Sequence, residues 1–176
     1  MNDLYLEQLD VKTTFLHGEL EEQIYIKQPE EFIIEEKEDH VFLLKKSLYD
    51  LKQSPRKWYK QFDSFMTGRE YSRSKRDSCV YFKKLDKGSF IYLLLDVDDI
   101  LIAFSNIVEI NKLKTLFKSE FEMKNLGATK KILGMEIKRD NKSGLLHLTQ
   151  EKHIEKILKR FGMTNAKSVS TPYCCW

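Results

Sequence analysis

The stretch Phe90 to Phe104, FIYLLLDVDDILIAF, places three carboxylates between two apolar runs. Each run is rich in Ile and Leu and is shorter than an ordinary helix, so the pattern predicts two buried strands that meet at a turn. Asp96, Asp98 and Asp99 then lie at or beside the tip of this hairpin. Neighbouring carboxylates repel one another and resist desolvation, and a bound cation would offset both costs.

A divalent cation is one of two interpretations of this acidic turn. Mg²⁺ is usually held by one or two carboxylates together with substrate phosphates, so a pair of aspartates at a strand end suits it. The other interpretation is an ordinary hairpin whose Asp-Asp turn faces water. The stretch by itself does not decide between them.

The composition is that of a globular protein with a divided charge distribution. Hydrophobic residues make up 41% of the 176 residues and charged residues 32%, which predicts one compact unit with a core. The formal net charge is +3, but residues 30–39 are acidic, whereas cations dominate residues 45–60 and 69–84. The basic segments are therefore candidates for contact with a phosphate backbone.

Several classes of protein and site are disfavoured by the sequence. Three cysteines, Cys79, Cys174 and Cys175, cannot form a disulfide framework, which indicates a reducing compartment. The sequence shows neither a secretory signal nor an apolar run that could span a bilayer, so we expect a cytoplasmic protein without a membrane partner. It also lacks a glycine-rich phosphate loop, a Rossmann fingerprint and the histidine and cysteine spacing of a zinc site.

The strands and helices predicted from the sequence segregate into an α+β pattern with an antiparallel sheet backed by helices. Strands are predicted over residues 4–11, 23–29, 41–46 and 79–84, and the last of these forms a meander with the 90–104 hairpin. A second hairpin is predicted over 130–150. The first strand ends at Asp10, so this carboxylate also lies at a strand end.

Three helices are predicted from capping residues and apolar stripes. Ser54 is expected to cap the first helix, with Pro55 at the first helical position, and Asn106 to cap the second. The stripe of the first helix is interpreted as core, in preference to a ligand platform, and the second helix is expected to cover the sheet with its stripe. They comprise Trp58, Phe62, Phe65 and Met66 in the first helix and Ile110, Leu113, Leu116 and Phe117 in the second.

The third helix is predicted to begin at Thr149 and to end at Gly162. Its apolar residues are expected to face inward: Ile154, Ile157, Leu158 and Phe161. Its opposite face is basic, with Lys152, Lys156, Lys159 and Arg160. A solvated surface explains these cations better than contact with nucleic acid, although both interpretations remain open.

A series of motifs runs along the chain: LDVKTTFLHGELEEQIYIKQPEEF, SLYDLKQSPRKWY, RSKRDSCVYFKK, LLLDVDDILIA, KNLG, LGMEIKRD and KSVSTP. Their order and spacing resemble those of the reverse transcriptases of copia-type retrotransposons over roughly residues 2 to 172. The resemblance implies an RNA-directed DNA polymerase with the palm of a right-handed polymerase. It also implies an RNA or DNA template with a primer, deoxynucleoside triphosphates, the remaining Pol segments as partners, and a virus-like particle in the cytoplasm.

The resemblance assigns the catalytic role to three carboxylates. Asp10 matches the first catalytic aspartate, and Asp98 and Asp99 match the pair of the family's Tyr-Val-Asp-Asp motif. Together they imply a site for two Mg²⁺ ions, or for Mn²⁺, at which a primer 3′-hydroxyl attacks a nucleotide. The three side chains are therefore expected to converge.

Four further residues receive roles from the resemblance. Phe15 matches the aromatic residue that screens out a ribose 2′-hydroxyl, although core packing is its other interpretation. Gln53 matches the glutamine of the nucleotide pocket, and Arg56 lies where a phosphate or the template could be met. Gly134 falls in what resembles the primer-gripping hairpin.

The sequence also departs from the family pattern. Asp96 replaces the tyrosine of the catalytic motif, and on an alternating strand it would share a face with Asp98. Asp50 replaces the glycine of LYGLKQ. The chain starts almost at the first catalytic motif and ends in a divergent YCCW, so residues 1–176 are expected to form a single palm domain without complete fingers, thumb or ribonuclease H. Little or no activity is expected of it alone, and a non-catalytic nucleic-acid-binding remnant of a decayed retroelement is the alternative.

Overall fold

The computed structural model describes residues 4–18, 20–85, 88–140 and 143–167. The chain divides into two compact units, Met1–Ala128 and Thr129–Trp176. Antiparallel sheets and three α-helices make up the described residues, which agrees with the predicted α+β class. None of these helices is long and apolar enough to cross a membrane. Cys174 and Cys175 lie outside the described residues.

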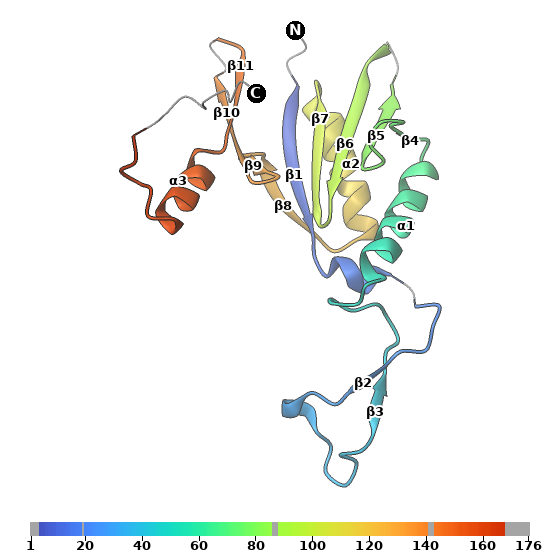
Figure 1. The fold of residues 1–176 in the computed structure, drawn as a ribbon. Coiled ribbons are helices and arrows are strands. Elements are labelled where there is room, and N and C mark those ends of the chain that lie inside the picture. The colour runs from blue at the N-terminus through green and yellow to red at the C-terminus, as the bar shows by residue number, and fades with distance from the viewer. Residues whose placement is uncertain (1–3, 19, 86–87, 141–142, 168–176) are drawn as a thin grey trace, which may run out of the picture. The chain divides into compact units, whose positions relative to one another are not determined.

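A six-stranded antiparallel sheet forms the centre of the first unit, in the order β4-β5-β6-β7-β1-β8 (Figure 1). The strands are β1 (Tyr5–Val11), β4 (Ser72–Arg73), β5 (Val80–Lys84), β6 (Phe90–Asp96), β7 (Asp99–Phe104) and β8 (Met123–Ala128). The predicted meander is confirmed, because β5, β6 and β7 are consecutive neighbours. The first strand of the chain lies between β7 and β8, which come much later in the sequence.

One face of this sheet carries the core. Alternation along the strands places Leu9, Leu93 and Ile100 on this face, and each is at most 1% exposed. The helices α1 (Ser54–Thr67) and α2 (Ile107–Glu120) cover it, and the rings of Phe62 and Phe117 stack at 5.9 Å where the two helices meet. The apolar stripes predicted for these helices are therefore confirmed as core.

The two helices begin differently. The start predicted for α2 is confirmed, because the Asn106 side chain accepts a hydrogen bond from the Val108 backbone N–H at 2.8 Å. The cap predicted for α1 is wrong: Gln53 is its N-cap residue and Ser54 is its first helical residue. The Ser54 hydroxyl instead donates to the Leu48 carbonyl oxygen at 2.6 Å, so it ties the preceding loop to the helix.

A two-stranded ribbon separates β1 from α1 in the chain. The segment comprises the 3₁₀ helix η1 (Thr14–His17), β2 (Tyr25–Lys27), the 3₁₀ helix η2 (Glu30–Phe32) and β3 (Val41–Leu43), so both strands are shorter than predicted. Gly18 lies at the junction with α1. A Cβ atom at this position would come within 2.8 Å of the Lys57 Cβ, so the close approach of the two segments requires glycine.

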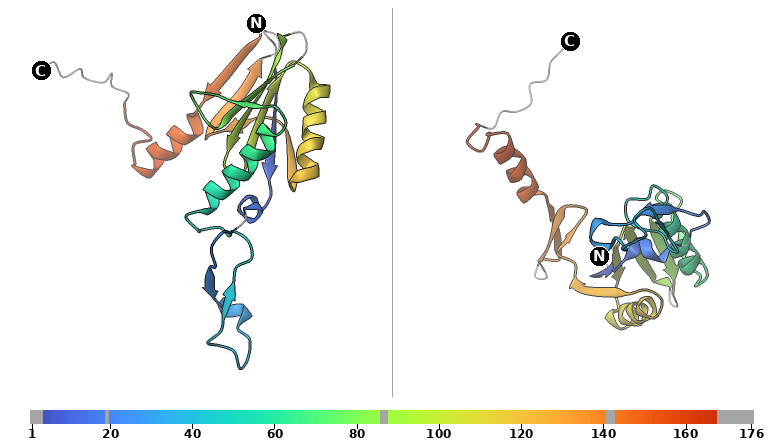
Figure 2. Two further views of the ribbon diagram at one scale, coloured as in Figure 1. Left: turned by 90° about the vertical axis from the view of Figure 1, so that its right-hand side faces the viewer. Right: turned by 90° about the horizontal axis from the view of Figure 1, so that it is seen from below.

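The described residues of the second unit form a three-stranded sheet and one α-helix (Figure 2). Its elements are β9 (Lys131–Ile132), β10 (Met135–Asp140), β11 (Leu145–Thr149) and α3 (Glu151–Arg160). The predicted hairpin is confirmed, although Asn141 and Lys142 of its turn lie outside the described residues.

The inward-facing stripe predicted for α3 is wrong. Ile154, Ile157 and Phe161 are 55%, 43% and 68% exposed, and α3 has no buried residue. A helix buries its apolar stripe only where another apolar layer covers it. The described part of this unit offers three short strands, which do not cover the stripe.

Candidate active site

Strand pairing brings Asp10 to the acidic turn. Asp10 of β1 lies opposite Asp99 of β7, and Asp96 of β6 lies opposite Asp99 from the other side. Directly opposed residues share a face of an antiparallel pair, with Cβ atoms about 4.5–5.5 Å apart. Asp96, Asp99 and Asp10 therefore form a row of carboxylates across three strand ends. The row lies on the face opposite to the core, since Leu9, Leu95 and Ile100 point the other way.

Asp98 lies in the two-residue turn that joins β6 to β7. The alternation of β6 stops at Asp96, so Asp96 shares its face with Asp99; the prediction that it shares a face with Asp98 is wrong. Val97, the other turn residue, has a φ of 57°. Two hydrogen bonds hold the turn: the Val11 backbone N–H donates to the Asp98 carbonyl oxygen at 2.8 Å, and the Trp58 indole N–H donates to the Val97 carbonyl oxygen at 2.7 Å.

Gln8 is a member of the site that the sequence did not reveal. Its Nε2 donates to Oδ1 of Asp99 at 2.8 Å, and the residue is only 7% exposed. The signal available in the sequence was its spacing, because Gln8 and Asp10 are two residues apart and so share a face of β1. The bond fixes one oxygen of Asp99 and leaves Oδ2 for another partner.

A cation lies beside Asp10. The hydrogen bond from Lys12 to Glu122, at 2.7 Å, raises the pKa of Lys12, and Asp10 contributes a smaller effect in the same direction. Lys12 is exposed, so solvent and salt weaken its influence on the carboxylates.

The donor set of the row fits a hard divalent cation. Carboxylate oxygens are the protein ligands of Mg²⁺, which is commonly held by one or two carboxylates with substrate phosphates and water completing the octahedron. Among the described residues no group of three or more His, Cys, Asp or Glu side chains is arranged to hold a metal ion. A cation at the row would need ligands from substrate phosphates and water as well.

Two of the predicted nucleotide-binding residues lie together at the start of α1. Gln53 and Arg56 line a cavity of about 350 Å³ with Glu21, Glu22, Lys57 and Lys60. A hydrogen bond from Lys57 lowers the pKa of Glu21, with weaker contributions from Lys60 and Arg56. The lining thus holds more cations than carboxylates. A phosphate that entered the cavity would find hydrogen-bond donors there.

The other two predicted residues, Phe15 and Gly134, lie in η1 and in the second unit. Phe15, in η1, packs against the core and meets the Tyr49 ring edge-on at 4.8 Å, which favours the packing interpretation. Gly134 lies in the second unit, where Leu133 and Gly134, with φ of 49° and 75°, make the tight turn between β9 and β10. Its role in gripping a primer stays a prediction.

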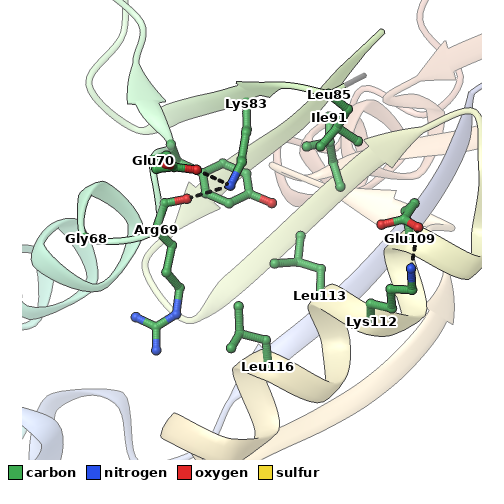
Figure 3. Close-up of a pocket in the computed structure, with 11 residues that line it drawn as sticks. Gly68, Arg69, Glu70, Lys83, Leu85, Ile91, Glu109, Lys112, Leu113 and Leu116 are labelled. Atoms are coloured by element: carbon green, nitrogen blue, oxygen red, sulfur yellow. Dashed lines mark hydrogen bonds and ion pairs between the residues drawn. The ribbon is translucent and has the colours of Figure 1, made fainter. Parts of the chain in front are cut away.

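A separate cavity of about 640 Å³ opens between α2 and the segment after α1 (Figure 3). Lys83 spans one side of it, donating to Glu70 Oε2 and to the Arg69 carbonyl oxygen at 3.0 Å each. Burial raises the pKa of Tyr71, in its lining, to about 12. The cavity adjoins Ile91, five residues before Asp96 along β6, or roughly 17 Å at the rise of a strand, so it is distinct from the carboxylate row.

Comparison with known proteins places the chain in a family. The family model of Reverse transcriptase (RNA-dependent DNA polymerase) matches residues 1–175. The chain is 54% identical over 170 residues to the Retrovirus-related Pol polyprotein from transposon TNT 1-94 of Nicotiana tabacum, a match that covers 97% of the chain and 13% of the polyprotein.

More distant relatives show the same pattern. The Retrovirus-related Pol polyprotein from transposon RE2 of Arabidopsis thaliana is 34% identical over 168 residues, covering 95% of the chain and 11% of that polyprotein. The putative transposon Ty5-1 protein of Saccharomyces cerevisiae is 30% identical over 166 residues, covering 94% of the chain and 53% of the relative. The chain thus spans a small part of either plant polyprotein, the family model matches nearly all of the chain, and the chain belongs to the reverse transcriptases of copia-type retrotransposons.

Proposed function

We propose that the chain is the palm of an RNA-directed DNA polymerase, which adds nucleotides to a primer 3′-hydroxyl. The observation that carries the proposal is the pairing of Asp10 with Asp99 next to the turn that holds Asp98. This pairing supports the prediction that the three carboxylates act together at one end of the sheet. Membership in the reverse transcriptase family supports it.

Asp10, Asp98 and Asp99 are the residues proposed to hold two Mg²⁺ ions, or Mn²⁺. When bound, the ions supply charge neutralisation and a primer hydroxyl of lowered pKa. Gln8 orients Asp99 through Oδ1, and the two hydrogen bonds to the turn orient the backbone of Asp98. Asp10, Asp98 and Asp99 are partly exposed within the first unit, which suits contact with a primer end.

The substrates and partners belong to the same proposal. A primer on an RNA or DNA template and deoxynucleoside triphosphates are the substrates, with Gln53 and Arg56 receiving the incoming triphosphate. The resemblance would add to the packing role of Phe15 the screening out of a ribose 2′-hydroxyl. The other Pol segments are the partners, because the relatives are Pol polyproteins of which this chain spans only a part. A virus-like particle is the proposed location.

Primer extension on an RNA template with Mg²⁺ tests the function, with the other Pol segments supplied. Asp98→Asn is expected to abolish extension, whereas Asp39→Asn, which changes an exposed carboxylate near the β2–β3 ribbon, is expected to leave it unchanged. Binding of primer–template is expected to weaken steeply as salt rises, because phosphate contacts dominate it. Binding without extension under every condition would favour the non-catalytic remnant.

A further inference from the structure

We propose that Trp58 is a positioning residue for the acidic turn, an inference that deepens the proposed function and rests on it. Trp58 lies in α1, is 2% exposed, and donates its indole N–H to the Val97 carbonyl oxygen at 2.7 Å. The apolar stripe of α1 identified this residue as core. Its polar atom, however, is directed at the turn that carries Asp98.

The turn needs this support because of its backbone conformation. Val97 is β-branched and has a φ of 57°, a left-handed conformation that such residues seldom adopt. The Trp58 bond fixes the carbonyl of Val97, and the Val11 N–H fixes the carbonyl of Asp98. With both carbonyls held, the direction in which the Asp98 side chain leaves the turn is determined.

The indole is itself held rigidly in the core. The Trp58 ring contacts the rings of Phe62 at 5.6 Å and Phe121 at 5.2 Å, and His17 lies 5.9 Å from it. The same helix begins with Gln53 and Ser54, about 7 Å along its axis from Trp58 at the helical rise. One rigid helix therefore supports both the turn and the proposed nucleotide-binding residues.

The substitution Trp58→Phe tests the role, because it keeps an aromatic ring and removes only the donor and part of the ring. Two matched controls separate positioning from stability. Tyr59→Phe, at the next residue, removes a hydroxyl that donates to the Ser78 carbonyl oxygen and accepts from Arg73, both of which lie outside the turn. Phe62→Leu reduces the packing of the same core without changing a hydrogen bond.

The measurements are Mn²⁺ affinity, from the relaxation of water protons, and the thermal midpoint of each variant. Trp58→Phe is expected to weaken Mn²⁺ binding by about tenfold or more, as is typical when a group that orients a metal ligand is removed. Both controls are expected to bind Mn²⁺ with an affinity within about twofold of that of the parent chain. Phe62→Leu is expected to lower the thermal midpoint. Equal affinity in Trp58→Phe and the parent, or an equal loss in the controls, would overturn the role of Trp58.

A second readout needs no change at Trp58. The chain has two tryptophans, so Trp176→Phe assigns the remaining indole N–H resonance to Trp58. We expect this proton to exchange slowly with solvent and its resonance to shift on addition of Mg²⁺ in the parent but not in Asp98→Asn. Rapid exchange would overturn the inference even if Trp58→Phe failed to fold. A parent chain that binds neither ion would instead overturn the proposed function, and the role of Trp58 with it.

Discussion

The helices α1 and α3 carry similar apolar stripes but differ in how far these stripes are buried. In α1 the stripe is buried, with Phe62 and Met66 at 0% exposure, whereas in α3 Ile154 and Phe161 remain more than half exposed. The first unit provides a six-stranded sheet and a second helix as partners, and the described part of the second unit provides neither. An apolar stripe thus shows which side of a helix can be buried. Whether that side contributes to stability depends on the presence of a layer that covers it.

Truncating an aromatic residue in each helix gives the largest expected difference. Phe62→Ala should lower the free energy of unfolding by about 3–5 kcal/mol, because Phe62 contacts the rings of Trp58, Tyr81, Phe117 and Phe121. Phe161→Ala should change it by less than about 0.5 kcal/mol. Urea unfolding of both variants measures the difference. Equal losses would mean that the stripe of α3 is covered in solution.

An ion pair in the first unit should contribute more to stability than an ion pair in the second unit. The Lys114–Glu7 pair is buried between α2 and β1, with side-chain exposures of 7% and 14%, and Lys114 also donates to Asn125. Lys114→Met should cost about 3 kcal/mol, because it leaves Glu7 unpaired beside the core.

The control for this prediction lies in the second unit. Lys152 is 80% exposed in its pair with Glu136, so Lys152→Met should leave the thermal midpoint unchanged. Adding Glu7→Leu to Lys114→Met should recover much of the loss. A midpoint for Lys114→Met equal to that of Lys152→Met would show that the buried pair is hydrated.

Alkaline titration should distinguish tyrosines by burial. Burial raises the pKa of Tyr71 from 10.0 to about 12, with a smaller contribution from Glu109. A group whose pKa is higher in the folded state stabilises the fold fully below its unfolded pKa, so this contribution should be lost as the pH rises from about 10 to 12. Phenolate absorbance and the thermal midpoint, compared with Tyr71→Phe, measure the two effects. A variant with the same alkaline profile as the parent would contradict the assignment.

Relieving backbone strain should raise the stability of both units by a similar amount. Asp50, with a φ of 71°, adopts the left-handed conformation, which explains the glycine that the family has at this position. Asp50→Gly should therefore stabilise the fold by about 0.5–1 kcal/mol. This is the free energy gained by relieving the steric clash, reduced by the greater conformational entropy that glycine gives the unfolded chain. Leu133→Gly, at a φ of 49° in the second unit, should give a similar gain. Unequal gains would show that packing modifies the strain.

The smallest effect is expected at the carboxylate row. Asp96 faces Asp99 directly, and opposed like charges cost about 0.2–1 kcal/mol in a sheet. Asp96→Asn should raise the thermal midpoint slightly in the absence of divalent cations, and Asp96→Tyr should raise it further because the ring adds contact area. Asp39→Asn serves as the control. If the midpoint fell instead, Asp96 would have a partner that the charge argument overlooks.

Local features of the fold were predictable from the sequence, and non-local ones were not. The Asn106 cap, the β5–β7 meander and the core stripes of α1 and α2 depend on residues close in the chain, and all are confirmed. The burial of α3 depends on a partner that no pattern within the helix reveals.

The same distinction applies to the site. The acidic turn was readable from its own fifteen residues, 90–104, and the resemblance to the family pointed to Asp10. The bonds from Gln8 and Trp58 cross between elements far apart in the sequence, and apolar or polar patterning carries no information about such partners. The roles of Gln53, Arg56 and Gly134 stay predictions that rest on the resemblance.

The position of β1 has a consequence for how the chain folds as it is synthesised. The meander of β5, β6 and β7 joins strands that are close in the chain and can form early, but β1 must wait for both β7 and β8 before its two edges are paired. Such long-range pairing is slow because a large loop must close first. Asp10 therefore reaches Asp99 only after β7 has been synthesised, 99 − 10 = 89 residues later, and the other edge of β1 stays unpaired until β8 follows.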